Sequence, residues 1–138
     1  MRKLFLAAVG AAFLMAGPAQ AGTLRLNIDG IRPLGGQVLV AVQTKEQFML
    51  PINTAAGVVD GNTDGRATLE LPVPDGEYSV LIMHDADNSF DLKMDDRGVP
   101  LEGVASGHGP LNGYPAFELV KVPMKGDTTL TTKMIYPE

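Results

Sequence analysis

The sequence contains no cysteine. This absence excludes disulfide bonds, thiol catalysis and a bacterial lipoprotein anchor, which requires a cysteine after the leader. Small exported domains often depend on disulfides, so this chain must be stabilised by its hydrophobic core alone. A domain of this length buries roughly two thirds of the surface of its unfolded chain, which is enough for such a core.

Basic residues are also scarce. The chain has 11 Lys and Arg against 16 Asp and Glu, and two of the basic residues, Arg2 and Lys3, lie at the very start. Without them, nine basic residues remain against sixteen acidic ones, a net charge of −7. Nucleic acids and anionic membranes require clustered Lys and Arg, so the composition disfavours both partners and is compatible with cation binding.

Catalytic motifs are missing as well. No serine lies in a Gly-x-Ser-x-Gly context, and no glycine-rich phosphate loop precedes a helix pattern. No segment with helical periodicity is longer than one or two turns. We therefore predict that the protein is not an enzyme and acts as a binding or accessory module.

The first 21 residues have the pattern of a signal peptide. A basic start is followed by an apolar run over residues 4–16, a Gly-Pro break and an Ala-Gln-Ala cleavage signal. The run is shorter than the ~20 residues that span a membrane, and no second apolar run follows. We predict a signal peptide over residues 1–21, a mature domain over residues 22–138 without a membrane span, and a periplasmic or secreted location.

Alternation of apolar and polar residues dominates the rest of the chain. Leu24, Leu26 and Ile28 share one face of a half-buried strand, whereas residues 38–42 and 77–83 are apolar on both faces, as in central strands. We predict an all-β domain, a prealbumin-like or Ig-like β-sandwich of about seven strands with one long acidic loop. The predicted strands cover residues 23–28, 37–43, 57–60, 66–71, 77–83, 117–122 and 128–136.

The long loop, residues 85–116, is acidic at its start. Compact domains connect their strands by ~4–6 residues, so either the loop has a function or it contains an unrecognised element. Asp85, Asp87 and Ser89 lie at positions 1, 3 and 5 of an EF-hand register, although Phe90 replaces the glycine of position 6. The hypothesis is a Ca²⁺ cage within residues 84–102, with the following candidate ligands: Asp85, Asp87, Asp95, Asp96 and Glu102.

Two alternatives remain open for these residues. Asp and Asn also stabilise turns by accepting hydrogen bonds from their own backbone, which would make the loop purely structural. His84 ends the predicted core strand, where we expect a partly buried histidine bonded to a loop carbonyl. A metal-assisted hydrolase would instead require His84 and His108 to lie close together beside the loop carboxylates.

Several motifs of the chain resemble the DUF2141 family of uncharacterised exported proteins. They are Asp75-Gly76-Glu77-Tyr78, His84-Asp85-x-Asp87-x-Ser89, Gly98-Val99-Pro100-Leu101-Glu102-Gly103 and Pro115-x-Phe117-Glu118. The resemblance implies an exported β-sandwich and marks His84, Gly98 and Pro100 as family loop positions. It implies no activity. Asp87 replaces a family Asn, and Ser89-Phe90 replaces Asn-Gly, so the departures fall on the candidate cage.

The stretch from Thr63 to Tyr78 is more distantly similar to transthyretin-like and carboxypeptidase-regulatory domains. These domains are mostly accessory or binding modules, and the related hydrolases end in Tyr-Arg-Gly-Ser, which this chain lacks. We therefore expect a protein or glycan partner in the cell envelope. A structural envelope protein that presents a sheet edge to its partner is the third possibility.

Overall fold

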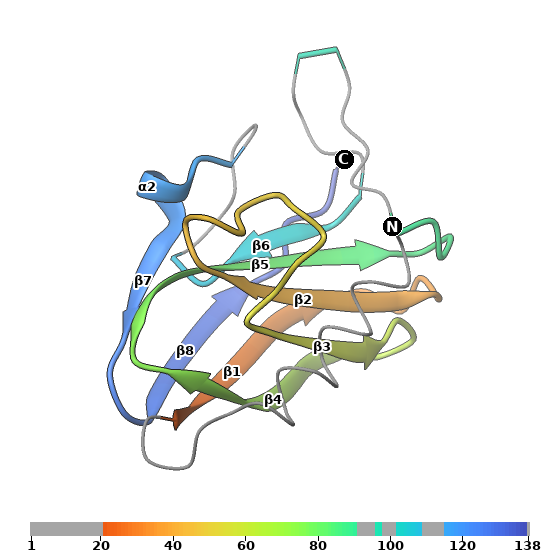
Figure 1. Ribbon diagram of the computed structural model, residues 1–138. Coiled ribbons are helices and arrows are strands. Elements are labelled where there is room, and N and C mark those ends of the chain that lie inside the picture. The colour runs from red at the N-terminus through yellow and green to blue at the C-terminus, as the bar shows by residue number, and fades with distance from the viewer. Residues whose placement is uncertain (1–20, 91–95, 98–101, 109–114, 138) are drawn as a thin grey trace.

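The computed structural model describes residues 21–90, 96–97, 102–108 and 115–137 (Figure 1). These residues form eight strands and one short helix. In chain order they are β1 (Ala21–Ile31), β2 (Gln37–Gln43), β3 (Ala55–Asp60), β4 (Gly65–Pro74), β5 (Gly76–Asp85), β6 (Val104–Ser106), α2 (Phe117–Val120), β7 (Lys121–Met124) and β8 (Thr128–Lys133).

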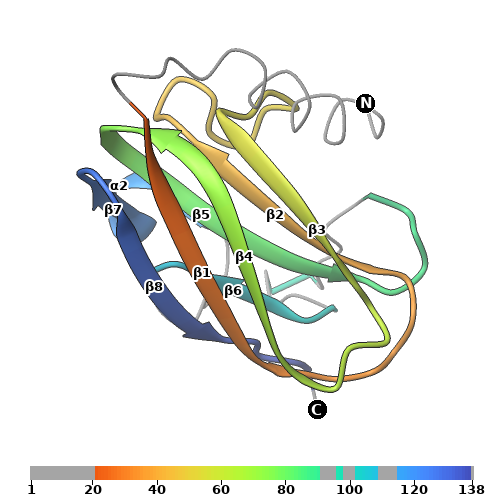
Figure 2. The same cartoon turned by 90° about the horizontal axis from the view of Figure 1, so that it is seen from below.

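The strands form two sheets that pack face to face (Figure 2). One sheet has the order β4-β1-β8, with β1 antiparallel to β4 and parallel to β8. The other has the order β3-β2-β5-β6, and β7 pairs with the first half of β5 on the same side as β6. The β-sandwich predicted from the sequence is therefore confirmed, with eight strands instead of about seven.

Alternation explains which side chains fill the space between the sheets. Leu24, Leu26 and Ile28 of β1 are fully buried in the main core cluster, while the polar residues between them face outward. The two strands that are apolar on both faces, β2 and β5, are central in their sheet, as predicted. Burying a large aliphatic side chain stabilises a fold by about 1.5–3 kcal/mol, so this row is a major part of the core.

Two sequence predictions were wrong. The long loop contains β6, which escaped notice because a three-residue strand is too short to show alternation. The predicted strand over residues 117–122 begins instead as the helix α2 and becomes extended only at Lys121. Phe117 and Val120 are buried three residues apart, a helical spacing, and the Phe117 ring packs edge-on against Phe48 at 5.7 Å.

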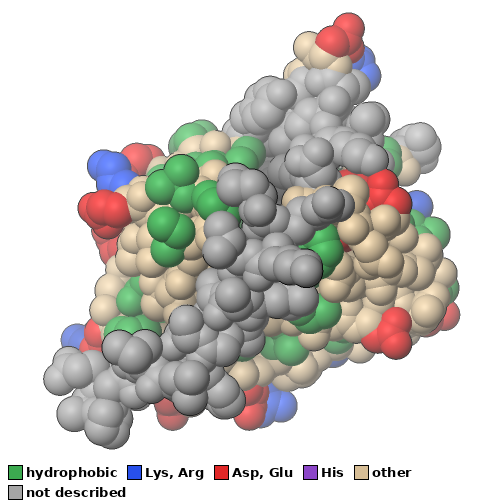
Figure 3. Space-filling model, turned by 45° about the vertical axis from the view of Figure 1, so that its right-hand side comes forward, with side chains coloured by type: hydrophobic (Ala, Val, Ile, Leu, Met, Phe, Trp, Pro, Cys, Tyr) green, Lys and Arg blue, Asp and Glu red, His purple; other side chains and the backbone are tan. Residues whose placement is uncertain are grey.

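The surface carries charges of both signs and scattered apolar side chains. In Figure 3 acidic and basic side chains lie next to each other at the margins of the face, with hydrophobic side chains between them. No helix among the described residues is long and apolar enough to cross a membrane. The large exposed apolar residues are Leu34, Met49, Leu50, Ile52, Val58, Leu119 and Ile135.

Candidate functional site

The acidic residues predicted as ligands begin at the end of β5. This strand pairs with β2 along its whole second half, and its last two residues, His84 and Asp85, are both fully buried. The turn between β1 and β2 closes over this end of the strand. A Cβ atom at Gly36, which has a φ of +67°, would lie 2.1 Å from the Asp85 carbonyl oxygen, so only glycine fits this close approach.

Asp85 organises the turn that follows β5. Its Oδ1 accepts hydrogen bonds from the Ser89 N–H (2.9 Å) and hydroxyl (3.2 Å), and its Oδ2 accepts one from the Phe90 N–H (2.9 Å). Asp87 also accepts from the Ser89 N–H at 3.2 Å. The turn-forming role that the sequence suggested for these aspartates is therefore present in the structure.

Phe90 stands where an EF-hand loop has glycine, and its backbone conformation is nevertheless one that glycine favours. The sixth position of such a loop requires a sharp turn and is normally glycine. Phe90 occupies this position with a φ of +59°, in the left-handed region that glycine favours. A bulky residue pays roughly 1–2 kcal/mol for this conformation, and the hydrogen bond to Asp85 helps to hold it there.

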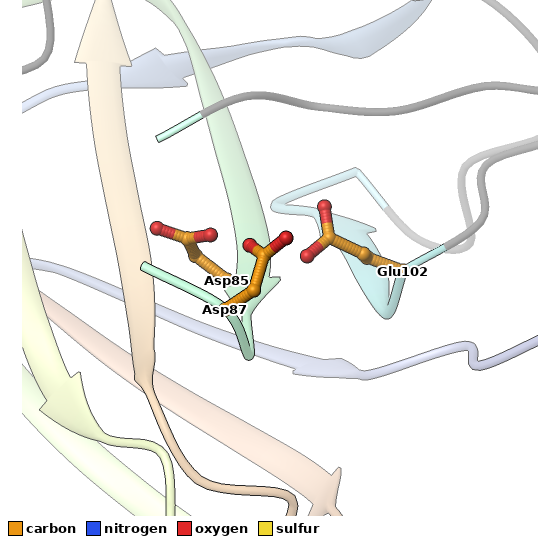
Figure 4. A group of neighbouring side chains, drawn as sticks. All are labelled: Asp85, Asp87 and Glu102. Atoms are coloured by element: carbon orange, nitrogen blue, oxygen red, sulfur yellow. The ribbon is translucent and has the colours of Figure 1, made fainter. Parts of the chain in front are cut away.

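Glu102 approaches the two aspartates from a different segment. It lies just before β6, and one oxygen each of Asp85, Asp87 and Glu102 falls within 4.8 Å of the others. Figure 4 shows the carboxylate of Asp87 between those of Asp85 and Glu102. The backbone bond from the His84 N–H to the Gly103 carbonyl, 2.8 Å, joins the two segments beside the cluster.

The burial of Asp85 is unusual for a carboxylate. Its exposed fraction is 0%, and within the described parts of the chain no lysine or arginine forms an ion pair with it. Buried carboxylates are normally paired with a cationic group or coordinate a metal ion. Clustered carboxylate oxygens are the donors that Ca²⁺ prefers.

His84 is held by both of its ring nitrogens. Nε2 lies 2.8 Å from the Gly35 carbonyl oxygen, so Nε2 carries the proton and donates. Nδ1 therefore accepts from the Tyr136 hydroxyl at 2.7 Å. The predicted bond to a loop carbonyl is thus confirmed, and in this arrangement neither nitrogen is available to a metal ion.

Two other predicted residues, Asp96 and His108, are described in the structure and do not belong to this cluster. Asp96 is exposed and does not belong to the carboxylate group. His108 is exposed as well, and among the described residues the group of possible metal donors includes neither histidine. Asp95, Gly98 and Pro100 lie outside the described residues.

Sequence reasoning missed Tyr136. The burial of its ring raises the pKa of its hydroxyl, and the Arg32 N–H and positive charge partly oppose this shift. Tyr136 was predicted only as the last residue of the strand over residues 128–136, and the structure packs its partly buried side chain against the core. Its contact with His84, 52 residues away, had no local signal in the sequence.

A hollow of about 360 Å³ lies near the opposite end of β5 from the carboxylate cluster. The buried rings of Tyr78 and Phe117 contribute to its wall. Its Glu118 pairs with Lys45 at 3.5 Å and with Lys121 at 2.9 Å. Glu46, Asp75 and Glu77 line it as well, and Glu77 lies 3.6 Å from Lys121. Among the described residues, only Asp85, Asp87 and Glu102 bring three carboxylate oxygens within 4.8 Å of one another, so the acidic residues of this hollow do not form such a cluster.

Together, the fold and the site define a class: β-sandwich domains with a carboxylate cluster at the end of a central strand. The chain belongs to the family described as "Uncharacterized protein conserved in bacteria (DUF2141)", whose model matches residues 26–132. The resemblance seen in the motifs is therefore confirmed over most of the chain. No curated protein and no solved structure gives a significant match.

Proposed function

We propose that this protein is an exported β-sandwich binding module whose carboxylate cluster, Asp85, Asp87 and Glu102, binds a Ca²⁺-type cation. The observation that carries the proposal is the convergence of three carboxylates around one position, with Asp85 fully buried and without an ion pair among the described residues. A bound divalent cation would compensate this buried negative charge and order the loop that follows β5.

The hydrogen bonds and the exposure of the three carboxylates support this proposal. Asp85 already positions the turn through its hydrogen bonds, so one ligand is preorganised at no further entropic cost. Asp87 is exposed and Glu102 is half-buried, which leaves a route for the ion from solvent. Ca²⁺ takes six to eight oxygens, so waters or backbone carbonyls would complete the shell.

A thermal melt tests the proposal. The purified protein is unfolded first in EDTA and then in millimolar Ca²⁺. A ligand at 100 times its Kd stabilises a fold by about 2.7 kcal/mol, which raises the Tm of a domain of this size by several degrees. We expect such a rise for the wild-type protein, and an unchanged Tm would contradict the proposal.

The chain offers a matched control for Asp87. Asp60 is also exposed and also accepts the backbone N–H two residues ahead, from Asn62 at 2.9 Å. Asp87→Asn and Asp60→Asn each keep a side-chain oxygen that can accept this turn contact, and each removes one negative charge. We expect only Asp87→Asn to abolish the Ca²⁺-dependent rise, and equal responses of the two variants would assign Asp87 to turn formation alone.

The other functional alternatives gain less support. The hydrolase needs His84 as a metal ligand, but hydrogen bonds occupy both of its ring nitrogens. The structural envelope protein needs a row of exposed apolar residues along an edge strand. The edge strand β8 presents threonines and Lys133 to solvent, and the exposed apolar residues Val58 of β3 and Ile135 after β8 are isolated ones. We propose that the module acts in the periplasm or outside the cell on a protein or glycan partner, with the carboxylate cluster as the centre of its binding surface.

A further inference from the structure

The carboxylate cluster depends on two segments that are distant in the sequence. Asp85 and Asp87 follow β5, whereas Glu102 precedes β6, and both segments must hold their position for the oxygens to converge. The pairing of β5 with β6 ends at Met83 and Val104, and Met83 is the residue before His84. Beyond this point a single backbone bond, from the His84 N–H to the Gly103 carbonyl, continues the ladder.

Tyr136 contacts both segments next to the cluster. Its ring lies against Gly103, where an added Cβ atom would come within 2.4 Å of the ring carbon Cε2. Its hydroxyl donates to Nδ1 of His84 at 2.7 Å. Gly103 directly follows Glu102 and His84 directly precedes Asp85, so one side chain supports the neighbours of two ligands.

Tyr136 is itself held firmly. The preceding residue, Ile135, exchanges two backbone hydrogen bonds with Val104, both of 2.9 Å. The Tyr136 hydroxyl accepts the Arg32 N–H at 3.0 Å, and the Arg32 guanidinium lies 4.9 Å from the ring centroid. The Tyr136 hydroxyl thus accepts from the β1–β2 turn and donates to His84. Three successive hydrogen bonds therefore link the Arg32 N–H, the Tyr136 hydroxyl, the His84 ring and the Gly35 carbonyl.

We propose that Tyr136 is a positioning residue that sets the geometry of the carboxylate cluster by holding His84 and Gly103. The inference rests on the proposed cation site. It assigns the C-terminal segment a role in that site, although Tyr136 contributes no ligand. Outer partners of this kind typically change metal affinity by 10–100-fold when they are removed.

The test uses Tb³⁺ as a luminescent substitute for Ca²⁺. Tyr136→Phe keeps the ring but removes the hydroxyl, and Tyr78→Phe, at the other end of β5, is the control for loss of a buried tyrosine hydroxyl. We expect Tyr136→Phe to raise the Kd roughly tenfold or more. Luminescence lifetimes in H₂O and D₂O should show additional bound water in this variant, because a displaced carboxylate leaves a coordination position open.

The outcomes separate the two proposals. If the wild-type protein binds no Tb³⁺, the cation site and the positioning role both fall. If the wild-type protein binds but Tyr136→Phe matches it in Kd and in bound water, only the positioning role of Tyr136 is overturned. Loss of affinity in Tyr78→Phe to the same degree would also overturn it, since the effect would then not be specific to this hydroxyl.

A measurement on the wild-type protein covers the case in which Tyr136→Phe does not fold. The Arg32 amide donates to the Tyr136 hydroxyl, so its hydrogen exchange reports on this contact. If Tyr136 and the cation site are coupled, saturation with Ca²⁺ must stabilise the contact in return. We expect slower exchange of the Arg32 amide, and an unchanged rate would overturn the proposal.

Discussion

Acidic residues lie in two different settings in this molecule. On the outer face of the β4-β1-β8 sheet two acidic side chains form ion pairs with arginines. Asp29 binds Arg66, and Glu70 lies 3.4 Å from Arg25. At the end of β5 the acidic side chains instead lie beside one another, and Asp85 is fully buried. Arginines balance Asp29 and Glu70 within the sheet, whereas Asp85 forms no ion pair within the described parts of the chain.

The two settings differ in the cost of burying a carboxylate, which is why we propose a binding site at the end of β5 and not on the sheet. Exposed ion pairs such as those of the sheet contribute little to stability, because water screens them and the side chains lose entropy. A buried carboxylate has a high desolvation cost, which must be offset by hydrogen bonds or a cation. The hydrogen bonds from Ser89 and Phe90 offset part of this cost for Asp85, and in the proposed site a cation would offset more of it.

The largest expected effect comes from removing the buried carboxylate. Asp85→Ala removes the acceptor of the Phe90 N–H and of the Ser89 hydroxyl, and it leaves the Ser89 N–H with Asp87 alone. A buried donor left unsatisfied costs about 1–3 kcal/mol, and the two donors that lose their acceptor are half-buried. We expect a loss of about 3 kcal/mol in the free energy of unfolding, measured by urea denaturation. Asp29→Ala on the sheet should cost far less, and equal losses would refute the distinction between the two settings.

A smaller effect is expected at alkaline pH. Burial raises the pKa of Tyr136 above its ordinary value of 10, so the folded state binds this proton more tightly than the unfolded chain. The resulting stabilisation is complete below pH 10 and is lost as the pH rises through the pKa of the folded protein. The Tm of the wild-type protein should therefore fall more steeply above pH 10 than that of Tyr136→Phe. Parallel curves would show that Tyr136 ionises without disturbing the fold.

The smallest effect concerns the exposed pair of the sheet. The hydrogen bond and charge of Arg66 lower the pKa of Asp29 below 3.8. A lowered pKa contributes stability above the pKa of the unfolded chain, and this contribution disappears as the pH falls through the folded value. Arg66→Ala should return the Asp29 pKa toward 3.8 in an NMR titration, with little change in Tm at pH 7. A large loss of Tm there would mean that the exposed pairs matter as much as the buried site.

The sandwich and its core were predictable from the sequence because alternation is a local property. Leu24, Leu26 and Ile28 reveal their common face without any knowledge of their partners. The same reasoning failed at residues 104–106, where the strand is too short to alternate. It also failed at Phe117 and Val120, because four residues can satisfy a strand or a helix pattern.

The candidate site was only partly predictable. Asp85 and Asp87 could be found from their spacing, because the turn after β5 is local. Glu102 was named as a candidate, but nothing in the sequence favoured it over Asp96 as the third carboxylate of the cluster. The link between Tyr136 and His84 depends on how the C-terminal segment crosses to β6, and a contact over that distance leaves no spacing pattern in a single sequence.

The most direct test of a cation site is a crystal structure of the protein grown with Tb³⁺ or Ca²⁺. The anomalous scattering of Tb³⁺ identifies the ion without ambiguity. We predict one strong peak about 2.3–2.6 Å from carboxylate oxygens of Asp85, Asp87 and Glu102. An empty cluster at a saturating ion concentration, or a peak only at the surface carboxylates of the β4-β1-β8 sheet, would contradict the account.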